Sequence, residues 1–405
     1  MKFASTFLIH SPADDQLTET IAVALGRRGI VSWLDNYELD ISDSLTGALK
    51  EAIKRQALIV VFVAQNNEVW NAGIIEALAA HQDWSSSVMV INSDESREHP
   101  SELTEKIARR ILLTISQQVV ETHQLLVCFD ERGTGGLRTG SPINVPRELG
   151  DIDTPMLVFR HDRGERDILT TLREEEWREY WKTVKTTLGR VLPQRDAIPV
   201  ELHLFGSAQL ALPLFLGKYL SRESNINLHG YNIPREERIS EDGGGPRLRN
   251  QKLRPTEHFT NARYSHLCAP TGGNQHCETA HPEIDPIGEG EEIETVALLL
   301  MRKEYATQAL RFVNTPGHGR PVLVEHDMFV YQGEVDEYVS NVIALLQRLT
   351  ANHSLRRIEI FTSLPFHVLP LLGASLHNVV NDVIFIESGS VEASIDPDYV
   401  ALSYR

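Results

Sequence analysis

The chain carries the segment Leu202-His-Leu-Phe-Gly-Ser-Ala-Gln-Leu-Ala-Leu-Pro-Leu-Phe-Leu-Gly-Lys-Tyr-Leu220. A similar segment begins 156 positions later, Ile358-Glu-Ile-Phe-Thr-Ser-Leu-Pro-Phe-His-Val-Leu-Pro-Leu-Leu-Gly-Ala-Ser-Leu376. Each reads as an apolar strand, a turn with a hydroxyl group, and a helix. Identical residues coincide at Phe205/Phe361, Ser207/Ser363, Leu216/Leu372, Gly217/Gly373 and Leu220/Leu376. Such a repeat predicts two equivalent units that can face each other across one pocket.

The repeat extends in both directions. Downstream, each segment leads to another apolar strand, at 226–231 and 382–387. Upstream, 155–162 parallels 321–327 and precedes a long helix, and 125–131 parallels 297–304. The predicted unit is strand, strand, helix, strand, helix, strand, with copies at about 120–231 and 295–405. Apolar strands alternating with helices predict mostly parallel α/β sheets, in which ligands lie beyond the carboxyl ends of the strands.

Charge and cysteine content limit the class of protein. The 405 residues carry a formal net charge of −17, which argues against general binding of duplex DNA. Cys128, Cys268 and Cys277 are too few and too scattered for a disulfide framework, so a reducing cytoplasm is expected. No apolar run approaches the length needed to span a membrane. We therefore expect a soluble, cytoplasmic protein of two or three domains.

The first 118 residues form a separate predicted α/β unit. Its expected strands are 7–10, 30–33, 58–63 and 88–91, and a helix from Ser101 to about Thr122 closes it. This region resembles a Toll/interleukin-1 receptor (TIR) domain in Phe7-Leu-Ile-His-Ser11, in Gly29-Ile-Val-Ser-Trp-Leu-Asp35, in a loop ending Asp43-Ser44-Leu45, and in Trp70 followed by Glu76. The resemblance implies a flavodoxin-like fold with a parallel sheet.

Enzymatic TIR domains cleave the nicotinamide–ribose bond of NAD⁺, which would be the substrate rather than a cofactor. The transition state resembles an oxocarbenium ion, so one carboxylate beside the ribose can stabilise it. The resemblance assigns this role to Glu76, although family members often place the glutamate four residues after the tryptophan, which leaves Glu68 as the other candidate. The expected NAD⁺-binding residues are Ser11, Trp33, Asp35 and Trp70, with core packing as the alternative role of both tryptophans.

Residues 119–405 resemble a SAVED domain, a sensor made of two fused CARF/Rossmann-like halves. The two strand–turn–helix copies carry this resemblance. It implies a TIR-SAVED effector of bacterial CBASS antiphage defence, activated by a cyclic oligoadenylate, with cyclic tri-adenylate the expected ring. Helix amino ends suit phosphates, and aromatic and guanidinium planes suit bases. The expected ligand residues are Arg160, His161, Ser207, Lys218, Tyr231, His326 and Ser363, with helix capping as the alternative role of both serines.

A polar insertion, 232–294, separates the two copies. Its first half is basic and its second half acidic, so it reads either as a flap over an anionic ligand or as a surface loop. It also contains Cys268, His276, Cys277 and His281, whose spacing fits no standard zinc motif, and we assign no metal or cofactor.

The resemblance also implies an activation mechanism. Ligand binding would drive assembly of a homo-oligomer, expected to be an open-ended filament through SAVED and TIR contacts. In that filament, the loop from Asp35 to Ser44 of one protomer would complete the NAD⁺ cleft of its neighbour. Two alternatives remain open at this point. The TIR domain could be a non-catalytic signalling adaptor, or the enzyme could respond to a protein ligand.

Overall fold

The fold is described from a computed structural model. The structure describes residues 2–34, 58–63, 88–92, 99–130, 149, 154–160, 174–193, 199–207, 211–221, 225–232, 257–260, 291–326, 332–376, 379, 382–388 and 399–403. The chain divides into two compact units, and the division falls within one strand. The first unit comprises Met1–Ile143 with Ile152–Leu202, and the second comprises Asn144–Asp151 with His203–Arg405. The first unit thus holds the N-terminal 118 residues together with the beginning of the first repeat copy.

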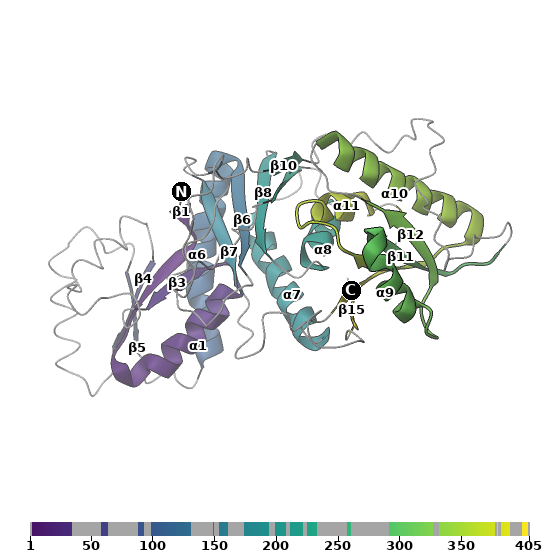
Figure 1. Cartoon of the computed structure of the whole chain (residues 1–405). Helices are drawn as coiled ribbons and strands as arrows, with labels where there is room; N and C mark the ends of the chain where they lie inside the picture. The colour runs from purple at the N-terminus through teal and green to yellow at the C-terminus, as the bar shows by residue number, and fades with distance from the viewer. Residues whose placement is uncertain are drawn as a thin grey trace, which may run out of the picture. The chain divides into compact units, whose positions relative to one another are not determined.

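A four-stranded parallel sheet forms the N-terminal part of the first unit (Figure 1). Its strand order is β3-β2-β4-β5, where the strands are β2 (Ser5–Ile9), β3 (Val31–Leu34), β4 (Leu58–Val63) and β5 (Val88–Asn92). Helix α1 (Asp15–Gly26) connects β2 to β3 and packs against α6 (Pro100–Thr122). All five residues of β2 are buried, as are the first five of β4, because both strands lie in the middle of the sheet. The predicted strands are confirmed to within two residues, and the helix to within one.

The duplication is confirmed by the order of the strands. One sheet has the order β1-β7-β6-β8-β9-β10 and the other β12-β11-β13-β14-β15. From β7 and from β12 onward the two orders match, and the last strand is antiparallel to its neighbour in both. The strands of the first copy are β6 (Gln124–Asp130), β7 (Pro155–Phe159), β8 (Val200–Ser207), β9 (Ile226–Asn232) and β10 (Glu257–Thr260). Those of the second are β11 (Thr295–Met301), β12 (Arg320–Glu325), β13 (Arg357–Thr362), β14 (Asp382–Ser388) and β15 (Tyr399–Ser403).

The pairing register also agrees with the alignment of the two copies. Leu126 pairs with Met156 in the first copy, and Leu298 pairs with Val322 in the second. These pairs follow from aligning Leu125 with Ala297 and Pro155 with Pro321. Long helices follow β7 and β12 as expected, namely α7 (Glu174–Val191) and α10 (Gln332–His353).

In the second unit, the helices that end the two repeat segments pack against each other. They are α8 (Ala211–Leu220) and α11 (Leu369–Ser375). Each also reaches the other copy's sheet, since α8 contacts β14 and α11 contacts β9. Phe215 of α8 meets Phe385 of β14 edge-on, with ring centroids 6.4 Å apart. The two halves of the repeat are therefore interlocked through their helices.

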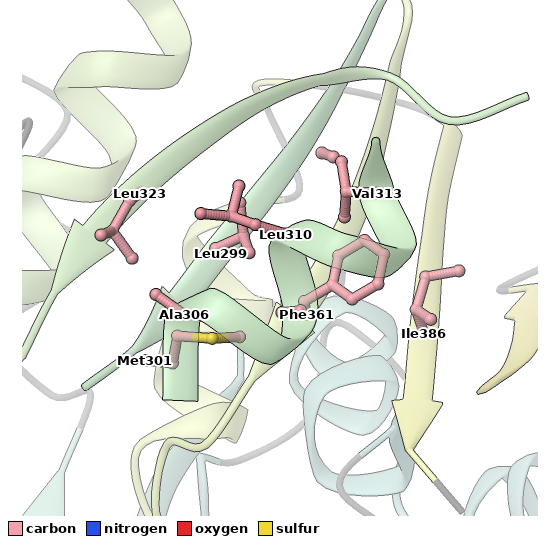
Figure 2. Packing of buried hydrophobic residues seen from close by; sticks show 10 residues of the cluster. Leu299, Met301, Ala306, Leu310, Val313, Leu323, Phe361 and Ile386 are labelled. Carbon is pink, nitrogen blue, oxygen red and sulfur yellow. The ribbon is translucent and has the colours of Figure 1, made fainter. Parts of the chain in front are cut away.

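Four elements differ from the expectation. Helix α9 (Lys303–Val313) lies between β11 and β12, where no helix was predicted, and it packs on the sheet beside Phe361 and Ile386 (Figure 2). Strand β10 lies inside the insertion at 232–294, where no strand was predicted. Strand β15 follows the last expected strand, and β1 (Lys2–Phe3) precedes the first. Each of these three strands lies at an edge of its sheet, where it has one pairing partner.

Candidate functional site

The carboxyl edge of the second-copy sheet carries a fixed polar turn. Thr362, the last residue of β13, donates a hydrogen bond from Oγ1 to the Leu300 carbonyl at 2.9 Å and accepts one from the Leu364 N–H, also at 2.9 Å. The Ser363 N–H donates to the same Leu300 carbonyl at 3.0 Å. The N–H groups of Ser363 and Leu364 are thus already used, and α11 begins only at Leu369. The predicted order of strand, turn and helix is therefore found in this copy, but the helix amino end lies at Leu369 rather than beside Ser363, which presents its hydroxyl group at this edge.

Two of the predicted ligand residues meet at this edge. His326 directly follows β12, and its Nε2 lies 3.3 Å from the Ser363 Oγ. The imidazole is 6% exposed and meets the Tyr338 ring edge-on at 5.8 Å. Tyr338 in turn donates from its hydroxyl group to the Val324 carbonyl at 3.1 Å, which fixes α10 on β12. This arrangement orients the imidazole toward the serine, as would be needed to recognise one polar group.

Helix α9 adds a cation and an aromatic ring near the same edge. Arg302 follows the end of β11 in extended conformation and immediately precedes α9, and Tyr305 in the first turn of α9 is 50% exposed. Neither residue was predicted to lie at the site, because no helix was expected between β11 and β12. The signal was available, since Ala306, Leu310 and Val313 follow helical spacing.

In the first copy, Arg160 is held by a neighbouring carboxylate. Its Nε lies 3.2 Å from the Asp130 Oδ2 at the end of β6. Counting from Pro155 and Pro321, Arg160 occupies the position that His326 has in the second copy. His161 lies outside the described residues. Ser207 ends β8, but its side chain is not described.

Lys218 and Tyr231 lie in the interior of the second unit. The Lys218 Nζ donates to the Leu376 carbonyl at 3.4 Å, and the side chain is 1% exposed. The Tyr231 hydroxyl lies 2.9 Å from the His203 Nδ1, and His203 stacks on His229 with ring centroids 4.6 Å apart. These partners explain how both polar groups are accommodated in the core, and contact of either residue with a ligand stays a prediction.

At the N-terminal sheet, one predicted NAD⁺ residue lies at the expected edge. Ser11 comes just after β2, is buried, and donates from Oγ to the Asp14 Oδ2 at 2.9 Å. Asp14 was not predicted as its partner. Trp33 lies in β3 opposite Phe7, but its side chain is not described. Asp35, Glu68, Trp70 and Glu76 lie outside the described residues.

Burial shifts the pKa values of Cys128 and His367 away from their usual ranges. It raises the pKa of the Cys128 thiol in β6, and the nearby Asp130 carboxylate adds to the shift. It lowers the pKa of His367, just before α11, to about 3. Within the described ranges, no three His, Cys, Asp or Glu side chains are placed to hold a metal ion. Cys268, His276, Cys277 and His281 lie outside those ranges. No helix in the described part of the chain has both the length and the apolar character needed to cross a membrane.

Comparisons with known proteins give structural neighbours only. No protein-family model matches the chain, and no curated protein matches it. The Cap4 SAVED/CARF-domain containing receptor of Acinetobacter baumannii is similar at 12% identity and a TM-score of 0.36, over 99% of this chain and 79% of that one. The structure of that receptor with the cyclic trinucleotide 2'3'3'-cAAA is similar at 11% identity and a TM-score of 0.39, over 99% of this chain and 80% of that one. The Cap4 SAVED/CARF-domain containing receptor of Moraxella osloensis is similar at 10% identity and a TM-score of 0.38, over 99% of this chain and 80% of that one. Because these TM-scores are low, the fold rests on the strand order and register of the chain itself.

Proposed function

We propose that this chain is a sensor-gated NAD⁺ hydrolase of antiphage defence, in which a cyclic oligoadenylate binds the duplicated region and activates the N-terminal domain. The duplication is the observation that supports the sensor role of residues 119–405, since the strand order matches in both copies and their helices α8 and α11 pack against each other. A ligand built of repeating nucleotides fits a site built of repeating units, because each unit can meet one nucleotide in a similar way.

The second-copy edge supplies chemistry that suits a nucleotide. The Ser363 hydroxyl and the His326 imidazole lie within 3.3 Å of each other and can share one phosphate or ribose oxygen. The cationic Arg302 and the exposed ring of Tyr305 begin the neighbouring helix. A guanidinium group suits a phosphate, and an exposed aromatic ring can stack on a base.

The N-terminal sheet supports the proposal of a TIR-type enzyme. Its order, β3-β2-β4-β5, corresponds to the first four strands of the flavodoxin-like order 2-1-3-4-5. Ser11 and Asp14 follow the carboxyl end of β2, the edge at which such sheets bind ligands. In the proposed reaction the ribose–nicotinamide bond breaks, water adds to the ribose carbon, and one proton is released. Glu76 would stabilise the positive charge that develops on the ribose.

Assembly completes the proposal. Ligand binding would favour an open-ended stack of protomers, which places TIR domains at high effective concentration. The loop from Asp35 to Ser44 of one protomer would then complete the NAD⁺ cleft of the next. The alternative is an adaptor that assembles on a ligand without cleaving NAD⁺.

The proposed hydrolysis of NAD⁺ is tested by measuring the fluorescence of etheno-NAD⁺ with and without cyclic di-, tri- and tetranucleotides. We expect turnover that depends on one cyclic nucleotide and falls at least about 100-fold in Glu76→Gln, the loss typical of removing an electrostatic stabiliser. Glu68→Gln is measured in parallel, since it removes the other candidate carboxylate, and a loss of turnover in that variant alone would assign the catalytic role to Glu68. Ligand binding without turnover in the unmodified chain would favour the adaptor.

The proposed binding of a cyclic oligoadenylate is tested by measuring the affinity for cyclic tri-adenylate by calorimetry. Ser363→Ala should weaken binding about two- to tenfold, the range for loss of one hydrogen bond. Ser340→Ala is the control, because the Ser340 Oγ donates only to the Asp336 carbonyl within α10, at 2.7 Å. Equal affinity for both variants would remove Ser363 from the ligand site.

A further inference from the structure

We infer that helix α1 couples the carboxyl ends of β6 and β7, where the cyclic nucleotide is predicted to bind, to the carboxyl end of β2, where NAD⁺ is predicted to bind. The ion pair between Arg160 and Asp130 is the switch, and ligand binding breaks it. All the residues involved belong to the first unit. The inference deepens the proposed function and rests on it.

The outer edge of β7 is bonded to the N-terminal domain at three successive points. The Ala4 N–H donates to the Met156 carbonyl at 2.8 Å, and β1 pairs with the same strand. The Val158 N–H donates to the Gly29 carbonyl, and the Arg160 N–H donates to the Gly26 carbonyl, both at 2.9 Å. The two parts of the unit thus share a hydrogen-bonded seam, so a displacement of β7 is passed directly to the turn that follows α1.

The turn in this seam has little freedom to move independently. Gly29 has a φ of +75°, a conformation that favours glycine, and a Cβ there would lie 3.1 Å from the Leu157 Cβ and 3.2 Å from the Phe159 ring. Glu105 of α6 lies between Arg28 of the turn and Arg190 of α7, with N···O distances of 3.9 and 2.6 Å. These contacts fix the position of the turn on β7 and α7.

Helix α1 links this seam to the predicted NAD⁺ edge. Gly26 is its last residue, and its first, Asp15, follows the Ser11–Asp14 turn. Thr18 donates from Oγ1 to the Asp14 carbonyl at 3.1 Å, which ties the turn to the helix. Twelve helical residues span about 18 Å, and α1 contains no proline, and no glycine before Gly26, at which it would kink. A shift of Gly26 therefore reaches Ser11 and Asp14.

Arg160 gives the ligand a means of producing such a shift. Its backbone N–H holds α1, while its guanidinium group is paired with Asp130; the two side chains are 18% and 31% exposed. A phosphodiester competes with the Asp130 carboxylate for the same guanidinium group. Ligand binding thus replaces Asp130 by a phosphate as the partner of Arg160, whose backbone N–H makes the last hydrogen bond to α1. Because the ligand makes this contact in only one of the two positions of β7, it can shift the equilibrium between them.

The first test is Asp130→Asn, measured as etheno-NAD⁺ turnover without ligand and as calorimetric affinity for cyclic tri-adenylate. We expect both to rise about two- to fivefold, the size that a partly exposed ion pair supports. Asp382→Asn is the matched control, since Arg357 Nε and Asp382 Oδ2 form the same atom pair at 2.8 Å at the other edge of a parallel sheet. Equal turnover in both variants overturns the inference.

The second test perturbs the seam while leaving the ion pair in place. Gly29→Ala should retain binding of cyclic tri-adenylate and lose most of the ligand-induced rise in turnover. Gly317→Ala is its control, because Gly317 also has a positive φ, +110°, but has no atom within 4 Å of a Cβ placed there. Normal activation of Gly29→Ala overturns the inference and leaves the proposed function intact. Failure of the unmodified chain to bind or respond to any cyclic nucleotide overturns both.

Discussion

Gly217 and Gly373 occupy equivalent positions in α8 and α11, and each lies against the backbone of the other helix. A Cβ on Gly217 would overlap the Pro370 carbonyl oxygen, and a Cβ on Gly373 would overlap the Leu214 carbonyl oxygen. Leu214 and Pro370 are themselves equivalent, since they also lie 156 positions apart. The contact is therefore reciprocal, like an isologous dimer interface that has been fused into one chain.

Alanine at either glycine should destabilise the second unit. Alanine normally stabilises a helix relative to glycine by about 1 kcal/mol, but here the methyl group would force the two backbones apart, which costs about 1–3 kcal/mol or more. The denaturant midpoint of Gly217→Ala and of Gly373→Ala should fall. The control is Gly189→Ala at an exposed position of α7, where the midpoint should rise or stay unchanged. A stabilised Gly217→Ala would contradict the close contact.

His367 should make stability depend on pH. Burial lowers its pKa from 6.5 to about 3 in the folded chain, so between these values the unfolded chain binds the extra proton. Its contribution is fully present above pH 6.5 and is lost as the pH falls toward 3. Between pH 7 and pH 5 the free energy of unfolding should drop by about 2 kcal/mol from this residue alone. His367→Gln should have a shallower dependence of denaturant midpoint on pH, and an unchanged slope would refute this assignment.

Cys128 should be chemically inert in the folded protein. The thiol is 3% exposed, and burial raises its pKa, so little of the reactive thiolate forms at pH 8. Iodoacetamide should leave the Cys128 peptide unmodified in the native chain and label it fully in guanidinium chloride, as read by mass spectrometry. Rapid native labelling would mean that β6 opens or that the thiol is accessible.

The central strands could be predicted because their neighbours bury both faces and leave continuous apolar runs, as in β4 and β11. Strands β1, β10 and β15 could not, since a pairing partner rather than their own sequence pattern specifies them. The same distinction applies to the site. His326 and Ser363 follow strand ends and were identified, whereas the pairing of Arg160 with Asp130 depends on the register between β7 and β6. Sequence periodicity carries no information on that register.

The pairing of β1 with β7 has a consequence for synthesis of the chain. Lys2 and Phe3 leave the ribosome long before their partners, Pro155 and Met156. Ala4 is bonded to both parts of the first unit. Its N–H donates to the Met156 carbonyl of β7, and its carbonyl accepts from the Val31 N–H of the N-terminal sheet, both at 2.8 Å. A nascent chain that stops before β7 therefore lacks the strand on which Ala4, Gly26 and Gly29 are anchored. The bonds that join the N-terminal domain to β7 can therefore form only after translation has entered the duplicated region.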